Sequence, residues 1–179
     1  MILLRYNDFS TGGELILKFY DYPIISKEGS LPVFLVSVGL NEWQYHVICG
    51  NGDNYAKALY CTKGSGVLII NGEKHIINPY TAFFIPAGCL HEYYSTDESW
   101  DTHWIKPSGK SCTDMLKALG FDKPKIFPLP KEEITYLDHC FRCMHEALLS
   151  DKVDGNFRAS GYLYSFFIEL SRLAAKGKG

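Results

Sequence analysis

The hydrophobic periodicity of this chain changes near Pro107, and that change decides its fold class. Before Pro107, short runs of β-branched and aromatic residues are separated by glycine, asparagine and proline, a pattern typical of strands joined by tight turns. After it, apolar residues recur every three or four positions, which is the spacing of one face of an α-helix. The sequence therefore predicts a mainly β fold with C-terminal helices.

Nine strands are expected before Pro107. The clearest turn is Asn71-Gly72, because a type I′ hairpin needs positive φ at both central positions, which Asn and Gly tolerate best. Many short strands without an intervening helix predict a sandwich or barrel rather than a parallel sheet. The expected strands are Glu14–Tyr20, Val33–Gly39, Trp43–Cys49, Tyr55–Lys63, Val67–Ile70, Glu73–Ile77, Ala82–Ile85, Leu90–Ser95 and Trp100–Lys106.

Three helices are expected after Pro107, the last two as an antiparallel pair. Ser111 caps a short first helix, Pro130 and the acidic residues after it begin the second, and the third runs from Asn156 to Lys176. Because a glycine inside a helix costs ~1 kcal/mol relative to alanine, Gly161 leaves open a later start of the third helix, as late as Ser160. Its apolar stripe could serve the chain's own core, but we expect it to pair two copies through Leu163, Phe166, Phe167, Leu170 and Leu173.

Composition excludes several classes of protein. The 179 residues are 46% hydrophobic and 21% charged, which excludes disorder. A formal net charge of −2 argues against a dedicated nucleic-acid surface. Six scattered cysteines do not resemble a disulfide scaffold, and no apolar run reaches the ~20 residues that cross a bilayer. We therefore expect a cytoplasmic protein with reduced thiols.

The segment from Phe83 to Tyr94 carries the sharpest motif. A Pro86-x-Gly88 turn joins two strands, and strand alternation places His91 and Tyr93 on one face of the second. This segment resembles the second conserved motif of the cupin superfamily, Gly-x5-Pro-x-Gly-x2-His, with Tyr80 in place of the first Gly. The resemblance implies a cupin-like β-barrel, that is, a double-stranded β-helix or jelly roll.

No metal and no other cofactor are expected. The resemblance to enzymatic cupins would place a His-x-His…Glu cluster about one hairpin earlier, near Gly52, Asn54 and Lys57. Glycine has no side chain, lysine is cationic and asparagine is a poor ligand for a soft metal. Cys140-x-x-Cys143 has no second ligand pair at zinc-site spacing, although His139 and His145 lie nearby, so we interpret it as helix packing.

The Trp-x3-Trp pair that begins at Trp100 makes the resemblance more specific. Together with Gly64-Ser65-Gly66, the Pro-Gly-His segment and the terminal helices, it resembles the N-terminal regulatory domain of AraC/XylS-family transcription factors, from about Val33 to Leu173. The resemblance implies a small effector bound inside the barrel, a homodimer, and DNA contacts made only by a following pair of helix-turn-helix motifs. We expect residues 177–179 to begin the linker to that part.

The same resemblance implies a set of ligand-binding residues. The arabinose-responsive member uses a Tyr two positions after the motif His and the second Trp of the pair, which are Tyr93 and Trp104 here. Thr102 replaces a His of that protein, and no arginine occurs between Asn41 and Tyr55, so a neutral sugar or glycoside is expected. Aromatic rings suit the C–H face of a sugar. The expected ligand-binding residues are Tyr93, Thr102, Trp104, His91, Asn41 and Trp100.

These expectations divide the chain into an N-terminal arm (1–13), a barrel (14–110) and a helical dimerisation segment (111–176). By resemblance, the arm folds over the effector with Leu3, Tyr6 and Phe9, and a frayed terminus is the alternative. The expected function is non-enzymatic sensing of a carbohydrate by an AraC-type regulator. Two other functions remain open: a metal-dependent cupin isomerase or oxygenase acting on a sugar or small acid, and an assembly module whose barrel is packed solid.

Overall fold

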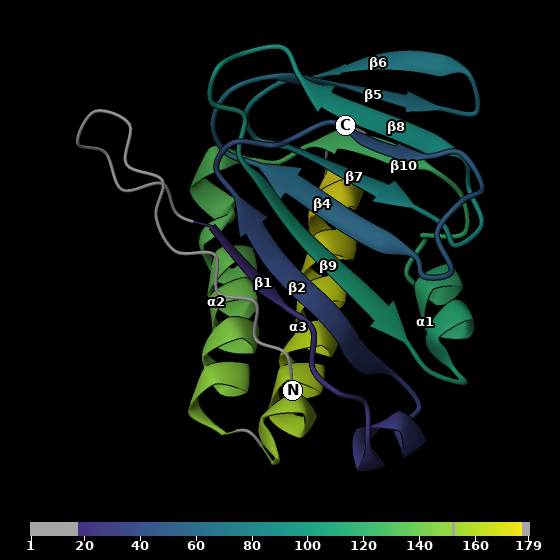
Figure 1. Cartoon of the computed structure of the whole chain (residues 1–179), viewed down its shortest axis with the longest axis vertical. Coiled ribbons are helices and arrows are strands. Elements are labelled where there is room, and N and C mark those ends of the chain that lie inside the picture. Colours follow the sequence, from purple (N-terminus) through teal and green to yellow (C-terminus); the bar gives the residue numbers. More distant parts are fainter. Residues whose placement is uncertain (1–17, 152, 177–179) are drawn as a thin grey trace.

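Two antiparallel sheets face each other, and two long helices cover the outer side of the larger sheet (Figure 1). The structure is a computed structural model that describes residues 18–151 and 153–176. The predicted start of the first strand at Glu14 and the arm residues Leu3, Tyr6 and Phe9 lie outside these described residues. The mainly β fold with C-terminal helices is confirmed.

Within the described residues, the larger sheet has six strands and the smaller has four. In spatial order the larger sheet contains β1 (Lys18–Asp21), β2 (Phe34–Asn41), β9 (Thr102–Ser108), β4 (Lys57–Cys61), β7 (Thr81–Ile85) and β10 (Lys125–Pro128). The smaller contains β3 (Val47–Cys49), β8 (His91–Ser95), β5 (Gly66–Ile70) and β6 (Glu73–Ile77). All nine predicted strands are present; β6 has the predicted ends, and each of the others is shifted at one end or both.

The β5–β6 turn and the strand β10 show where strand prediction succeeded and failed. Asn71 and Gly72 have φ values of 52° and 82°, so the predicted type I′ hairpin is confirmed. The sequence did not predict β10, which pairs antiparallel with β7 although it lies within residues 111–176. Its proline, Pro128, is tolerated because β10 is an edge strand and no further ladder needs the missing N–H.

After β9 the described residues form three α-helices, α1 (Cys112–Ala118), α2 (Thr135–Ser150) and α3 (Gly155–Lys176), with β10 between α1 and α2. Two short 3-10 turns lie at Lys27–Ser30 and Lys131–Glu133, so the second helix begins later than Pro130. The alternative prediction that α3 starts as late as Ser160 is wrong, because the helix begins at Gly155 and Gly161 lies within it. The packing of α3 on both sides of Gly161 outweighs the cost of that glycine. None of the helices in the described part combines the length and apolarity needed to cross a membrane.

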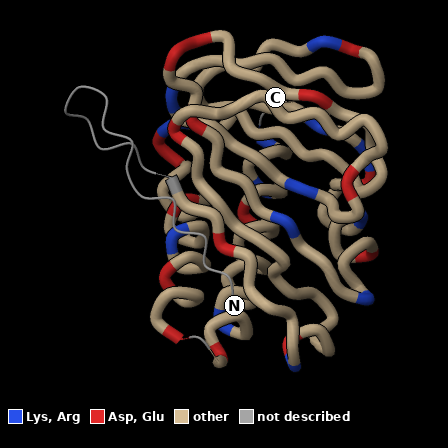
Figure 2. Tube along the Cα trace, in the orientation of Figure 1, with Lys and Arg blue, Asp and Glu red and all other residues tan. Residues whose placement is uncertain are grey.

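Two apolar cores lie on opposite faces of the larger sheet. On β4, Leu59 belongs to the core between the sheets, while its neighbours Ala58 and Tyr60 belong to the core between the sheet and the helices. Both faces of the strand are covered, which explains why all five of its residues are buried and why its sequence lacks a polar face. In Figure 2, positive and negative residues are dispersed over sheets and helices.

The predicted dimer contact needs correction. Its five residues are only 0–1% exposed and pack inside the chain against the larger sheet and α2, so they present no surface to a second copy. These residues are Leu163, Phe166, Phe167, Leu170 and Leu173. The outward face of α3 instead carries Tyr164 and Ile168, which are 48% and 49% exposed.

Candidate functional site

A cavity of about 140 Å³ lies between the two sheets and is lined by residues from both. Trp104 and Lys106 come from β9, Lys57 from β4 and Tyr93 from β8. Because alternate residues of a strand point to the same side, Trp104 and Lys106 share the cavity side of β9. The remaining lining residues are Tyr22, Asn41, Gln44, Tyr45, Val47, Cys49 and Asp53.

The indole of Trp104 lies against the backbone of Gly39, its direct partner across the β2–β9 ladder. A Cβ placed on Gly39 would be 2.3 Å from Cζ2 of the indole and 2.8 Å from its Nε1. Only glycine leaves room for the ring to lie there. The rings of Tyr20 and Tyr22 follow at centroid distances of 6.0 and 5.8 Å from the indole, so one wall of the cavity is aromatic.

A chain of hydrogen bonds fixes the two amide side chains of the site. Tyr20 Oη donates to Asn41 Oδ1 at 2.7 Å, and Asn41 Nδ2 donates to Gln44 Oε1 at 3.3 Å. Thr102 Oγ1 also donates to Gln44 Oε1, and Gln44 Nε2 donates to the carbonyl oxygen of Tyr45 at 2.7 Å. Side chains held in this way need little further ordering when a ligand binds, which favours affinity.

Three charged groups meet in the lining of the cavity. Asp53 Oδ2 lies 2.5 Å from Nζ of Lys106 and 3.1 Å from Nζ of Lys57. Burial alone would raise the pKa of Asp53, but hydrogen bonds from Lys106 and the Tyr55 N–H and the charge of Lys57 lower it to about 2. Burial and the neighbouring charge of Lys106 lower the pKa of Lys57, against the opposing attraction of Asp53.

His91 lies behind Lys57 and is held by both of its ring nitrogens. Nδ1 is 2.8 Å from the carbonyl oxygen of Cys89, which can only accept, so Nδ1 carries the proton. Nε2 is then left to accept from Nζ of Lys57 at 3.1 Å. Burial, together with the charge of Lys57, lowers the pKa of His91, which agrees with a neutral ring.

The groups around His91 do not fit a metal ion. The lone pair that would bind a metal is already paired with an ammonium group, and that group's positive charge would repel a cation. Within residues 18–151 and 153–176, no three His, Cys, Asp or Glu side chains are placed to hold a metal. Cys140 is buried, Cys143 Sγ lies 3.6 Å from His139 Nε2, and His145 instead binds Asp21, so these helical residues do not converge either.

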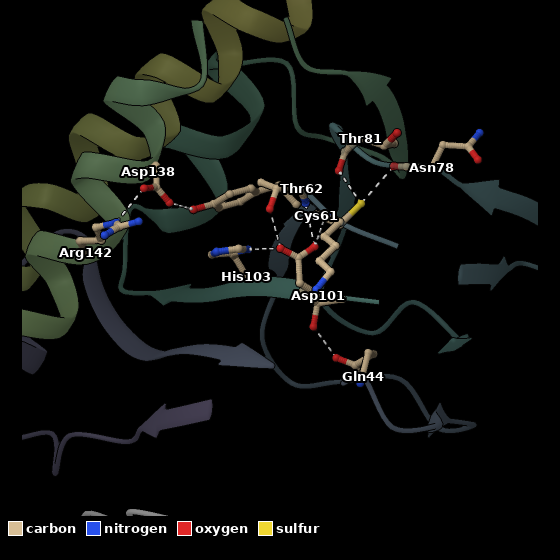
Figure 3. A network of polar contacts seen from close by, with 12 residues as sticks. Gln44, Cys61, Thr62, Asn78, Thr81, Asp101, His103, Asp138 and Arg142 are labelled. Atoms are coloured by element: carbon tan, nitrogen blue, oxygen red, sulfur yellow. Dashed lines mark hydrogen bonds and ion pairs between the residues drawn. The ribbon is translucent and has the colours of Figure 1, made fainter. Parts of the chain in front are cut away.

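A polar network on the helix side of β9 holds the strand in place (Figure 3). The carboxylate of Asp101 accepts from N and Oγ1 of Thr62 at 2.7 and 2.6 Å. His103 stacks on Tyr60 at 4.3 Å, and Tyr60 Oη donates to Asp138 of α2 at 3.1 Å. Asp101 and His103 thus point away from the cavity, because they alternate with Thr102 and Trp104 along the chain, and they tie β9 to β4 and α2.

The six predicted ligand-binding residues fall into three groups. Asn41, Tyr93 and Trp104 line the cavity. Thr102 and His91 lie directly behind it, where they position Gln44 and Lys57. Trp100 is fully buried in the core between the sheets and packs on Gly66, so the expectation that it lines the site needs correction.

Sequence reasoning missed most of the polar lining. Lys106 follows Trp104 by two positions on the same strand, so strand alternation places both side chains on the same side of β9. The positive charge of Lys57 excluded it as a metal ligand, but the same charge pairs with Asp53 in the cavity lining. Tyr22, Gln44, Tyr45 and Asp53 lie in loops, where no sequence period indicates which way a side chain points.

Larger hollows of about 320, 480 and 560 Å³ lie outside the barrel, at the joins between the sheets and the helices or loops. The smaller barrel cavity is the better candidate because an aromatic wall, two fixed amides and a charged cluster converge there. Small-molecule sites combine an apolar wall with a few well-placed polar groups in this way.

Comparison with known proteins relates this arrangement to one family. Residues 51–167 match the family model described as an AraC-like ligand-binding domain, whereas no curated protein matches. The chain is similar to ToxT K231A from Vibrio cholerae strain SCE256, with a TM-score of 0.54 and 11% identity over 84% of this chain and 58% of that one. It therefore spans less than two thirds of the ToxT chain.

Two other solved structures are similar to a lesser degree. ToxT from Vibrio cholerae O395, bound to (E)-4-(8-methylnaphthalen-1-yl)but-3-enoic acid, has a TM-score of 0.49 and 13% identity over 82% of this chain and 57% of that one. A Cupin 2 conserved barrel domain protein from Salinispora arenicola CNS-205 has a TM-score of 0.37 and 14% identity over 50% of this chain and 74% of that one. The two facing sheets, the α2–α3 pair and the similarity to ToxT K231A confirm the predicted fold, a cupin-like barrel followed by a helix pair.

Proposed function

This chain belongs to the family of AraC-like ligand-binding domains, and we propose that it senses a small carbohydrate for a transcriptional regulator. The observation that carries the carbohydrate assignment is the convergence of the Trp104 indole with the fixed amides of Asn41 and Gln44 in one cavity. An indole offers an apolar face to the C–H groups of a sugar ring, and amide side chains both donate to and accept from hydroxyls.

The size and chemistry of the cavity support a single sugar ring. Its 140 Å³ is below the ~300–1,000 Å³ of pockets for drug-sized ligands. Burial raises the pKa of Tyr93 well above its usual value, so the phenol keeps its proton and acts as a donor to a ligand oxygen. The presence of this cavity beside Trp104 also argues against a barrel packed solid, and therefore against a pure assembly module.

The proposed role is binding without chemistry. Asp53 is ionised and paired with both lysines, and His91 is neutral with both ring nitrogens engaged, so these groups hold one another in place. A metal-dependent isomerase or oxygenase would need ligands that this cluster does not supply. We therefore favour a sensing domain over a cupin enzyme.

The effector acts on the regulator through its different affinities for two arrangements of the protein. Strand β2 borders the cavity through Asn41 and supports α3 through its opposite face, so it connects the site with the helices. We propose that dimerisation uses the outward face of α3 around Tyr164 and Ile168 rather than its buried stripe. In this proposal residues 14–110 are the effector barrel, 1–13 are an arm, 111–176 are the dimerisation segment, and DNA is bound by a part of the regulator beyond residues 177–179.

Thermal unfolding with a panel of monosaccharides tests the proposed site. A ligand at 100 times its Kd stabilises the folded state by ~2.7 kcal/mol, and Trp104→Ala should abolish that increase in Tm. Trp43→Ala, which removes an exposed Trp outside the cavity lining, is the matched control and should keep the increase. If no sugar or sugar derivative raises the Tm of the unmodified chain, the carbohydrate assignment fails. An increase that survives in Trp104→Ala would place the ligand elsewhere.

A further inference from the structure

The charged groups of the barrel cavity do not balance one another. Lys57 and Lys106 contribute two ammonium groups, and Asp53 contributes the one carboxylate that both contact. The other described lining residues are tyrosines, amides, a valine, a cysteine and Trp104. The described lining therefore carries one excess positive charge.

This excess charge lies in a place where water gives little compensation. Lys57 is only 3% exposed, and its Nζ is enclosed by Asp53, by His91 and by the face of Tyr93, whose centroid is 5.9 Å away. Neither His91, which is neutral, nor the ring face supplies a negative charge. A buried charge without a full counter-charge is unfavourable unless another group pairs with it.

We infer that the effector carries one carboxylate, and that the effector class is a sugar acid, such as a uronic or aldonic acid, rather than a neutral sugar. A single negative charge balances the cavity, and charge-assisted hydrogen bonds to Lys106 and Lys57 would be stronger than those of a neutral hydroxyl. A phosphate, with a charge near −2, would leave the site overcompensated. The inference rests on the proposed function, since it assigns the chemical class of the same ligand.

This assignment revises the expectation of a neutral effector. That expectation followed from the absence of an arginine between Asn41 and Tyr55, but the strand residues Lys57 and Lys106 bring cations to the cavity from other parts of the sheet. Asp53 then has a defined role, because it holds both ammonium groups at the cavity while leaving one charge for the ligand.

Matched pairs of sugars test the inference by isothermal titration calorimetry of the whole chain. D-Galacturonate is compared with D-galactose, and D-glucuronate with D-glucose, because the members of each pair differ only in a carboxylate at C6. In at least one pair we expect the acid to bind at least tenfold more tightly than the neutral sugar. Lys106→Met should reduce that ratio to within threefold of one, whereas Lys110→Met, an exposed lysine just after β9, should leave it unchanged.

A second variant guards against misfolding of the first. Asp53→Asn removes the internal counter-charge, so the ratio of acid to neutral affinity should rise; the Tm of each variant reports that it is folded. Equal affinities within every pair would overturn the sugar-acid inference but leave a carbohydrate sensor in place. A preference for the acid that survives in folded Lys106→Met would also overturn it, and binding of no sugar of either kind would overturn the proposed function itself.

Discussion

Gly39→Ala should impair ligand binding more than it impairs folding. Gly39 lies directly opposite Trp104 in the β2–β9 ladder, and the indole occupies the space that a side chain at position 39 would fill. A methyl group there would be 2.3 Å from Cζ2 of the indole, while carbon atoms in contact are ~3.5–4.0 Å apart. The indole must therefore move by roughly 1.2–1.7 Å, and the open side available to it is the cavity.

The size of both effects follows from this displacement. Overpacking a close-packed interior costs ~1–3 kcal/mol, which at ~2–4 °C per kcal/mol for a chain of this size lowers the Tm by about 2–12 °C. A shift of more than 1 Å in a ligand-contacting wall of a 140 Å³ cavity should weaken binding at least tenfold.

Calorimetric titration with the tightest-binding sugar of the panel measures the affinity, and thermal unfolding measures the stability. Gly50→Ala is the matched control, because no described atom lies within 4 Å of the position of a Cβ at residue 50. It should bind as the unmodified chain does. Unchanged affinity in Gly39→Ala, with the variant folded, would refute the assignment of Trp104 as a wall of the ligand site.

Two further predictions concern charge and packing. Because the pKa of Asp53 is lowered to about 2 from 3.8, its contribution to stability is present above pH ~4 and is lost as the pH falls towards 2. Urea unfolding at pH 5, 4 and 3 should therefore show a larger fall in the free energy of unfolding for the unmodified chain than for Asp53→Asn. The difference should reach up to ~1 kcal/mol after allowing for solvent screening of the pair. A parallel loss in both chains would contradict the pairing with the two lysines. Leu170→Ala should lower the free energy of unfolding by ~2–5 kcal/mol because Leu170 is buried in the core. Ile168→Ser should leave the free energy of unfolding nearly unchanged and should shift the sedimentation coefficient towards that of a monomer. A shift towards the monomer in Leu170→Ala but not in Ile168→Ser would instead support the buried stripe as the dimer contact.

Much of the fold could be predicted because its signals are local. The Asn71-Gly72 hairpin depends on two residues that tolerate positive φ, and the helices depend on a regular apolar spacing. β10 escaped prediction because only four residues form it and its partner β7 is far away in the sequence. The dimer contact was misassigned because an apolar helix stripe looks the same whether it faces its own sheet or another chain.

The site was predictable only where strand alternation or family resemblance applied. Tyr93 follows from both, Trp104 follows from the resemblance, and Lys106 would have followed from Trp104 by alternation. Asp53 could not be found in this way, because it lies before β4 and its pairing with two lysines is a product of tertiary structure. The charge of the cavity, from which we infer the class of ligand, is therefore a property of the folded barrel and not of any one segment.

The larger sheet separates the cavity from the helices by the thickness of a single polypeptide backbone. On β2, Gly39 supports the indole on one side, while the adjacent Val38 packs into the helix-facing core on the other. A ligand that displaces β2 therefore also changes the packing of α3, because no further layer of the described structure lies between the strand and the helix. A change in the occupancy of the cavity and a change in the position of the helices are therefore coupled.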